Sequence, residues 1–176
     1  MDRDVELATL TSLLDLDEFE VVESSRDRRE KMRRLTVTPK VIVGLCPHCH
    51  GIADERHACH DRVVRDLPMG GQQVELVVRL SQYRCRACDK FFTPRLAALA
   101  QGSHATERLL ERLAALASRS DVATAAGFFG IAEKTAEGWY YQYIEQKEPG
   151  PRLEPVRSLG IDELSLKKDT GNSAAC

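Results

Sequence analysis

The sequence predicts an α+β protein in which a small zinc-clamped β-domain is followed by a three-helix domain. Cys46 and Cys49 form one Cys-x-x-Cys pair, and Cys85 and Cys88 form a second. Strand-type apolar patterning surrounds both pairs, whereas the apolar residues after Thr106 recur at helical spacing. We therefore divide the chain into four segments: an N-terminal helix and β-hairpin over 1–40, the four-cysteine β-domain over 41–98, the helical domain over 103–148 and a C-terminal linker segment over 149–176.

The composition is that of an ordinary globular protein, because 30% of the 176 residues are charged and 43% are hydrophobic. No apolar run reaches the roughly 18 residues of a membrane span. Residues 1–5 lack the basic start and apolar core of a secretory signal. We therefore expect no contact with a membrane and a cytoplasmic location. In that reducing compartment, paired cysteines indicate metal ligands rather than disulfides.

Positive charge is concentrated around the cysteines, although the whole chain carries a net charge of −2. Residues 31–118 contain fourteen basic and eight acidic residues, whereas residues 1–30 contain ten acidic and four basic ones. Local charge governs contact with phosphate groups, so the middle of the chain is the expected nucleic-acid face. We expect the acidic N-terminal segment to pack on the β-domain or to meet a partner rather than to contact phosphate. The alternative is that the basic residues form an ordinary solvated face.

The segment before the first cysteine pair combines helix, strand and turn signals. Leucines at helical spacing predict a short helix over 5–16, and residues 19–23 indicate a strand. Residues 24–34 are almost wholly polar, which is typical of a hairpin tip or a loop. Strand patterning returns over 35–43 and runs directly into Cys46.

Two further strands are expected between the cysteine pairs and one after them. A turn at Gly70-Gly71 follows residues 61–68, because a proline and two glycines lie close together there. Residues 72–80 alternate apolar and polar side chains and predict a half-buried strand that runs into Cys85. Residues 90–94 predict a short closing strand.

The helical segment contains three helix signals in succession. Thr106 supplies a capping hydroxyl for the first helix, and Asp121 begins a second, which we expect to break over 127–131. A third helix is expected over 133–146, with an inner face made of Ala136, Trp139, Tyr140 and Tyr143. Three short helices joined by a glycine-containing turn are typical of a helix-turn-helix domain.

The four paired cysteines are the expected ligands of a zinc ion. Two residues between thiolates let both sulfurs of a pair reach one tetrahedral metal, and four thiolates close the coordination sphere. Such a zinc is structural and has no open position for water. Cys59 is an alternative ligand in place of one of the four. His57, Cys59 and His60 form a second cluster of donors, but a second metal there lacks an evident fourth ligand.

Basic residues around the second cysteine pair are candidates for phosphate contacts, which supply the sequence-independent part of DNA affinity: Arg79, Arg84, Arg86, Lys90 and Arg95. In a helix-turn-helix, the last helix enters the major groove with its first residues near the base edges. Outward-facing candidates on that helix are Lys134, Thr135 and Gln142. Because Glu133 and Glu137 flank Lys134, the helix is only weakly basic, which leaves contact with a protein as an alternative. Double-stranded DNA is the expected partner.

Taken in order, these motifs resemble the N-terminal half of insertion-sequence transposases of the ISL-three family. The matching blocks are residues 45–49, 65–68, 83–88, 91–93 and 159–168. The resemblance implies a zinc-binding domain and a helix-turn-helix that hold transposon ends, and hence a protein associated with the nucleoid. It further implies that Asp162 matches the first carboxylate of an acidic triad on the first strand of an RNase-H-like domain. It also suggests a homodimer, because transposases pair two DNA ends.

The chain departs from the family pattern after Lys168. Only 26 residues follow Gly150, which is too few for an RNase-H-like sheet. Metal-assisted strand transfer needs carboxylates that hold two metal ions, so Asp162 is only a vestigial catalytic candidate and no magnesium is expected. We therefore predict a zinc-stabilised DNA-binding protein derived from a transposase, without catalysis by itself. Two alternatives are the DNA-binding part of an active transposase completed by another polypeptide, and a zinc-folded adaptor for protein interactions.

Overall fold

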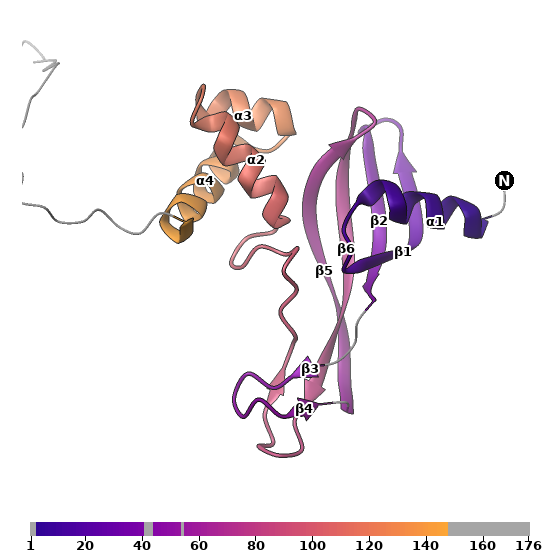
Figure 1. Cartoon of the computed structure of the whole chain (residues 1–176). Helices are drawn as coiled ribbons and strands as arrows, with labels where there is room; N and C mark the ends of the chain where they lie inside the picture. The colour runs from indigo at the N-terminus through magenta and orange to yellow at the C-terminus, as the bar shows by residue number, and fades with distance from the viewer. Residues whose placement is uncertain (1–2, 41–43, 54, 148–176) are drawn as a thin grey trace, which may run out of the picture.

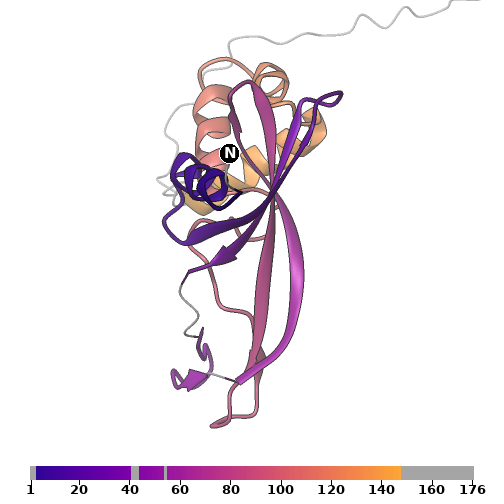
Figure 2. The same ribbon diagram turned by 90° about the vertical axis from the view of Figure 1, so that its right-hand side faces the viewer.

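The computed structural model describes residues 3–40, 44–53 and 55–147. Together these residues form a body, a helical unit and a pair of knuckle-like turns (Figure 1). A sheet that carries one helix forms the body. A unit of three helices lies beside one end of this body, and two knuckle-like turns lie far from that unit at the other end (Figures 1 and 2). Two long strands, β5 (Glu55–Met69) and β6 (Gln72–Arg84), run through the body and reach the knuckles. One β-ribbon therefore connects both ends of the protein.

The sheet has the strand order β1-β2-β6-β5. β1 (Phe19–Asp27) and β2 (Met32–Pro39) form one antiparallel hairpin, and β5 and β6 form another. The two hairpins join where β2 runs parallel to β6, with Arg33 beside Val74 and Val37 beside Val78. The boundary predicted at residue 40 therefore falls within one hydrogen-bonded sheet, because strands on both sides of that boundary pair with each other.

Helix α1 (Arg3–Leu14) covers one face of the sheet. Its buried side chains Leu10 and Leu14 meet apolar residues at alternate positions of the strands, which the period-two geometry of a strand places on one face: Phe19, Val21, Leu35, Val37, Val74, Leu76, Val78 and Leu80. Burial of each of these large side chains stabilises the fold by about 1.5–3 kcal/mol. Asp15, with φ 51°, follows the helix, and the Phe19 N–H then donates to the Leu16 carbonyl at 3.0 Å. The predicted N-terminal helix and first strand are confirmed.

The turn between β5 and β6 lies where the sequence predicts it. Gly70 and Gly71 have φ values of 58° and 73°, which is the combination that a two-residue hairpin turn requires. β5 begins earlier than expected, at Glu55, and its positions 56–61 are exposed. His57, Cys59 and His60 are therefore strand residues. The sequence does not reveal this strand because a ribbon exposed on both faces has no period-two apolar pattern.

The helical unit consists of α2 (Glu107–Ala117), α3 (Val122–Phe129) and α4 (Glu133–Lys147), which pack around a second core. Both predicted caps are present, because the Thr106 hydroxyl accepts from the Leu109 N–H at 3.3 Å and the Asp121 carboxylate accepts from the Thr124 N–H at 2.7 Å. α3 extends through Phe129 instead of breaking at residue 127, and it ends at Gly130. The expected inner face of α4 packs on the core: Ala136, Trp139, Tyr140 and Tyr143.

A buried ionic network attaches the helical unit to the sheet. Asp66 on β5 is 2% exposed, and its carboxylate accepts from the Thr106 hydroxyl at 2.7 Å and from Arg108 Nε at 2.9 Å. Arg108 Nη2 donates to the second carboxylate oxygen, and Arg108 Nη1 donates to the Asp15 carbonyl at 3.1 Å. The backbone of Arg65 adds two hydrogen bonds of 2.9 Å, to the His104 carbonyl and from the Thr106 N–H. The start of α2 is therefore fixed to β5 and to the end of α1.

The C-terminal linker over 149–176 and the candidate catalytic residue Asp162 lie outside the described residues. In the part of the chain that the structure describes, none of the helices has the length and apolar character needed to cross a membrane.

Candidate metal centre and nucleic-acid interface

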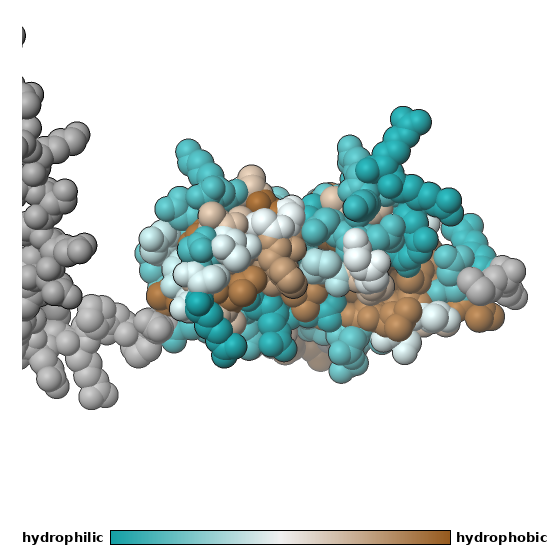
Figure 3. All heavy atoms as spheres, turned by 90° about the horizontal axis from the view of Figure 1, so that it is seen from above, coloured by the Kyte–Doolittle hydropathy of each residue, from teal (hydrophilic) through white to brown (hydrophobic). Residues whose placement is uncertain are grey.

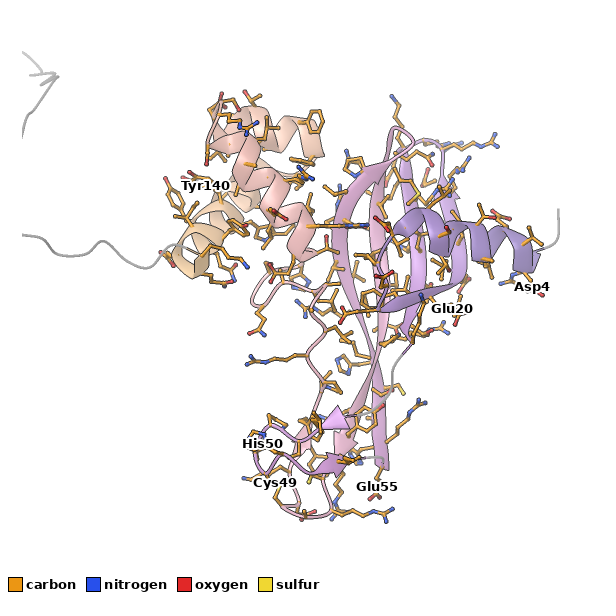
Figure 4. The ribbon with its side chains drawn as sticks, viewed as in Figure 1. Asp4, Glu20, Cys49, His50, Glu55 and Tyr140 are labelled. Carbon is orange, nitrogen blue, oxygen red and sulfur yellow. The ribbon has the colours of Figure 1, made fainter. Side chains whose placement is uncertain are left out.

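Two knuckles with matching backbone geometry hold the four paired cysteines. β3 (Gly44–Leu45) and β4 (Ile52–Ala53) flank the first knuckle, and the end of β6 and β7 (Phe91–Phe92) flank the second. In the first, the His50 N–H donates to the Cys46 carbonyl at 2.9 Å, and in the second the Asp89 N–H donates to the Cys85 carbonyl at 2.8 Å. His50 and Asp89 both adopt positive φ, 58° and 55°, so each chain segment turns back tightly. Figure 4 shows Cys49 and His50 at this end of the ribbon, near Glu55 at the start of β5.

The two knuckles bring the four sulfurs together in a geometry that fits zinc. All four Sγ atoms lie within 4.8 Å of one another. Cys46 Sγ is 3.5 Å from Cys88 Sγ, and Cys49 Sγ is 3.5 Å from Cys85 Sγ. A tetrahedral zinc with bonds of about 2.3 Å places its sulfurs roughly 3.8 Å apart, which is close to these separations. The predicted zinc cofactor is confirmed, and it is structural because four thiolates leave no position for substrate or water.

A very small apolar core supports the metal centre. Cys46 and Cys85 are buried together with Ala53, Tyr83 and Phe92, and the Tyr83 and Phe92 rings stack with centroids 6.1 Å apart. Gly44 makes this packing possible, because a Cβ atom there would lie 3.1 Å from the Phe92 ring. So few apolar residues bury little surface, and metal binding therefore supplies most of the folding free energy of this end of the protein.

The surroundings of the clustered thiols shift the pKa values of Cys46 and Cys88 in opposite directions. Burial acts to raise the pKa of Cys46, but hydrogen bonds from the backbone at His48 and Cys49 and from neighbouring thiols lower it to about 7. Burial raises the pKa of Cys88 to about 12, and neighbouring thiols contribute to the increase. Four adjacent thiolates repel one another, so full ionisation of the cluster requires a cation at its centre. Zinc provides that charge, and its binding releases the remaining protons.

The other candidate ligands lie outside this cluster. Cys59 is exposed on β5, with its sulfur 3.7 Å from the Ser81 hydroxyl, and it does not replace any of the four cysteines. The His57 ring packs against Phe91 with centroids 4.5 Å apart. Within the described residues, the paired cysteines are the one group of three or more metal-compatible side chains, so the alternative of a second metal at His57, Cys59 and His60 gains no support.

The basic residues near the second knuckle are exposed, and two of them form ion pairs. Arg84 Nη2 lies 2.6 Å from an Asp89 oxygen, and Arg86 Nε lies 3.1 Å from a Glu55 oxygen. Such exposed pairs contribute only about 0–1 kcal/mol, so either arginine can exchange its carboxylate for a phosphate at little cost. Lys90 is exposed and forms no ion pair with the residues that the structure describes.

The remaining two basic candidates lie nearer the body. Arg79 is exposed on β6 and lines a cavity of about 710 Å³ together with Lys40 and Arg56. Arg95 is exposed on the segment that leads from the second knuckle to the helical unit. These two side chains are therefore displaced along the ribbon from Arg84 and Arg86.

The candidate contact residues on α4 differ in their surroundings. Lys134 and Thr135 are exposed in its first turn. Gln142 is half-buried, and its side-chain amide donates to the Gln101 carbonyl at 2.6 Å. This hydrogen bond ties the Gln142 side chain to the loop before α2, so Gln142 is less free to contact DNA than Lys134 and Thr135.

Three residues with clear structural roles were not recognised as such from the sequence. Arg65, Asp66 and Arg108 hold the helical unit against the sheet, which sets the position of α4 relative to the ribbon. Arg65 and Asp66 belong to the block 65–68 that contributes to the family resemblance, but their partners lie about 40 residues away or more, and no local spacing reveals them.

Comparison with known proteins identifies the zinc-binding part of the chain. Residues 42–88 match the family model of the zinc-finger of transposase IS204/IS1001/IS1096/IS1165. This range contains both cysteine pairs, so the resemblance to ISL-three transposases is confirmed for this part of the chain. No curated protein and no solved structure matches the chain.

Proposed function

We propose that this protein is a zinc-stabilised, transposase-derived protein that binds duplex DNA, and that α3 and α4 form its helix-turn-helix. The observation that carries the proposal is the junction of these two helices. Gly130 closes α3 with φ 59°, and the Ile131 N–H donates to the Ala126 carbonyl at 2.9 Å. Ala126 and Ala136 are both buried, so small side chains let α3 and α4 approach closely on either side of a short turn.

The start of α4 has the exposure that a recognition helix needs. In such domains the first residues of the last helix lie near base edges in the major groove. Lys134 and Thr135 occupy this position, and both are exposed. A positively charged side chain and a hydroxyl at a helix N-terminus suit contact with phosphate and base acceptors.

The zinc end provides a second region for DNA contact. β6 spans 13 residues, or roughly 40 Å at the rise of a strand, and it separates the knuckles from the β5–β6 turn beside the helical unit. One turn of B-DNA is about 34–36 Å long. The two regions therefore suit one face of a duplex at positions about one helical turn apart, with Arg84, Arg86 and Lys90 on the phosphates.

The test is binding of zinc-loaded full chain to duplex DNA from the flanks of its own gene at several salt concentrations. We expect affinity to fall steeply as salt rises, because phosphate contacts release counterions. K134Q/T135A is expected to weaken binding about tenfold or more, whereas K147Q at the opposite end of α4 is a matched control and should change it less than twofold. Wild-type protein with one zinc per chain and no salt-sensitive binding would refute the proposed function.

A protein-interaction adaptor is the second candidate function. Phe128 on α3 and Tyr141 on α4 are 68% and 56% exposed, and aromatic side chains are enriched where proteins meet. Salt-insensitive binding to a protein, without binding to duplex DNA, would favour this candidate.

A further inference from the structure

The turn between β1 and β2 is strongly basic. Residues 26–34 contain six basic and two acidic side chains within a stretch of nine. Residues 26–31 are all exposed, and they lie at the same end of the body as the helical unit (Figure 1). Figure 3 views the molecule from above this end and shows hydrophilic residues projecting from its surface.

The acidic residues of this turn do not neutralise its arginines. Asp27 Oδ1 accepts from the backbone N–H groups of Arg29 and Glu30, at 2.9 and 3.2 Å, and so stabilises the turn itself. Arg34 pairs with Glu75 at 2.9 Å, which keeps its charge on the side of the sheet. Four basic side chains form no ion pair with any described residue: Arg26, Arg28, Arg29 and Lys31.

A chain of hydrogen bonds fixes this turn relative to the junction of α3 and α4. The Gln73 N–H donates to the carbonyl of Lys31, within the basic turn, at 2.9 Å. The side chain of Gln73 accepts from Arg65 Nη2 at 2.9 Å, and the same nitrogen donates to the Gly130 carbonyl at 3.3 Å. The turn is thus about two or three strand spacings from Gly130, or roughly 10–15 Å. Gln73 and Arg65 connect the two features, so the spacing between the turn and the junction is set by the folded protein.

We propose that the β1–β2 turn is a second DNA-contacting element, which binds the phosphate backbone beside the groove entered by α4. This inference rests on the proposed function, because it places α4 in the major groove. That groove is about 12 Å wide, which matches the separation between the basic turn and the α3–α4 junction. The guanidinium groups of Arg26, Arg28 and Arg29 suit phosphate because each presents several donors in a planar fork. They read no bases in this position, and instead add affinity and fix the orientation of the helical unit.

The test compares two full-length variants from which the same amount of charge is removed. R26Q/R28Q/R29Q removes three positive charges from the turn, and R3Q/R112Q/K147Q removes three exposed charges elsewhere. Both are measured with zinc content and circular dichroism verified, on the gene-flanking duplex used for the wild type. Because each phosphate contact contributes about 0.9 to the slope of log K against log salt, the turn variant should lower that slope by about 2–3. Its affinity near 0.1 M salt should fall at least tenfold, whereas the control should change less than threefold.

The outcomes separate this inference from the proposed function on which it rests. Wild-type affinity and slope in R26Q/R28Q/R29Q, with K134Q/T135A still impaired, would overturn the inference and leave the proposed function standing. Equal losses in the turn variant and the control would also overturn it, because they would indicate a general charge effect. Absence of duplex binding by the wild type would overturn both. A loss of slope confined to the turn variant supports the inference.

Discussion

Replacement of Asp66 by asparagine is the sharpest test of how the helical unit is held on the sheet. The side chain of Asp66 is 1% exposed and that of its partner Arg108 is 26% exposed. Loss of one partner of a buried ion pair costs about 3–5 kcal/mol when the other charge stays buried. Arg108 can regain part of its hydration, whereas the Thr106 hydroxyl can still bond to the amide oxygen. We therefore expect D66N to lower the free energy of unfolding by about 2–3 kcal/mol.

The assay is urea unfolding of zinc-saturated protein, followed by the fluorescence of Trp139. This is the one tryptophan of the chain, and it packs against the core of the helical unit, so its signal reports on the part that D66N loosens. E111Q makes the same chemical change at an exposed position of α2 and should stay within about 0.5 kcal/mol of the wild type.

A double-mutant cycle with R108M isolates the interaction from other effects of each substitution. Because Asp66 and Arg108 contact directly, we expect D66N/R108M to be less destabilised than the sum of the single variants, by about 1–3 kcal/mol. A D66N variant that unfolds like E111Q, or single effects that simply add, would show that the carboxylate does not hold α2 against β5.

Three further predictions test the metal centre, the α3–α4 junction and the cap of α3. C85S should lose the one zinc ion bound per chain and unfold the knuckles, whereas the control C59S should retain the metal. Metal analysis of the purified variants measures this, and a zinc-bound C85S would refute the ligand assignment. G130A should lower the free energy of unfolding in urea by about 1–2 kcal/mol, because Gly130 has φ 59° and the new Cβ would lie 2.6 Å from Gln73 Nε2. G127A is the control, since a Cβ at Gly127 meets nothing within 4 Å, and it should be neutral or stabilising. Hydrogen bonds from the Thr124 N–H and hydroxyl lower the pKa of Asp121, so the stability it contributes is present above its unfolded pKa and is lost as pH falls through the folded pKa. D121N should therefore flatten the acid side of the stability profile below about pH 5, and an unchanged profile would contradict this role.

Local patterns predicted those parts of the fold that depend on neighbouring residues. The caps at Thr106 and Asp121, the Gly70-Gly71 turn and the inner face of α4 follow from spacings within a few residues. The two cysteine pairs likewise predicted the metal centre, because the spacing within each pair already fixes the knuckle geometry.

Features that depend on distant pairings could not be predicted in this way. The parallel contact of β2 with β6 and the docking of Asp66 on Arg108 join residues about 40 positions apart. The basic character of the β1–β2 turn was hidden for a different reason. The charge count over residues 1–30 placed Arg26, Arg28 and Arg29 in the same segment as the acidic residues of α1 and β1, so the segment as a whole was acidic. The hairpin instead brings these arginines beside Lys31 at one exposed tip.

The β-ribbon that joins the two ends of the protein also implies an order of folding. β5 and β6 close across a two-residue turn, whereas β2 meets β6 across separations such as the 41 positions between Arg34 and Glu75. Because the entropic cost of closing a loop rises with the sequence separation of its ends, the β5–β6 hairpin should form first and the β1–β2 hairpin should then add to its edge.

Formation of the same hairpin brings the two cysteine pairs together. Pairing that starts at Gly70-Gly71 and proceeds to Arg84 brings Cys85 opposite the start of β5, beside the first knuckle. Zinc then closes the 36-position loop between Cys49 and Cys85, which in the chain-entropy model reduces the freedom of the unfolded chain by roughly 4 kcal/mol. Zinc thus fixes the β5–β6 hairpin at the end opposite its turn, so loss of zinc should let the two strands separate from the knuckles toward the body.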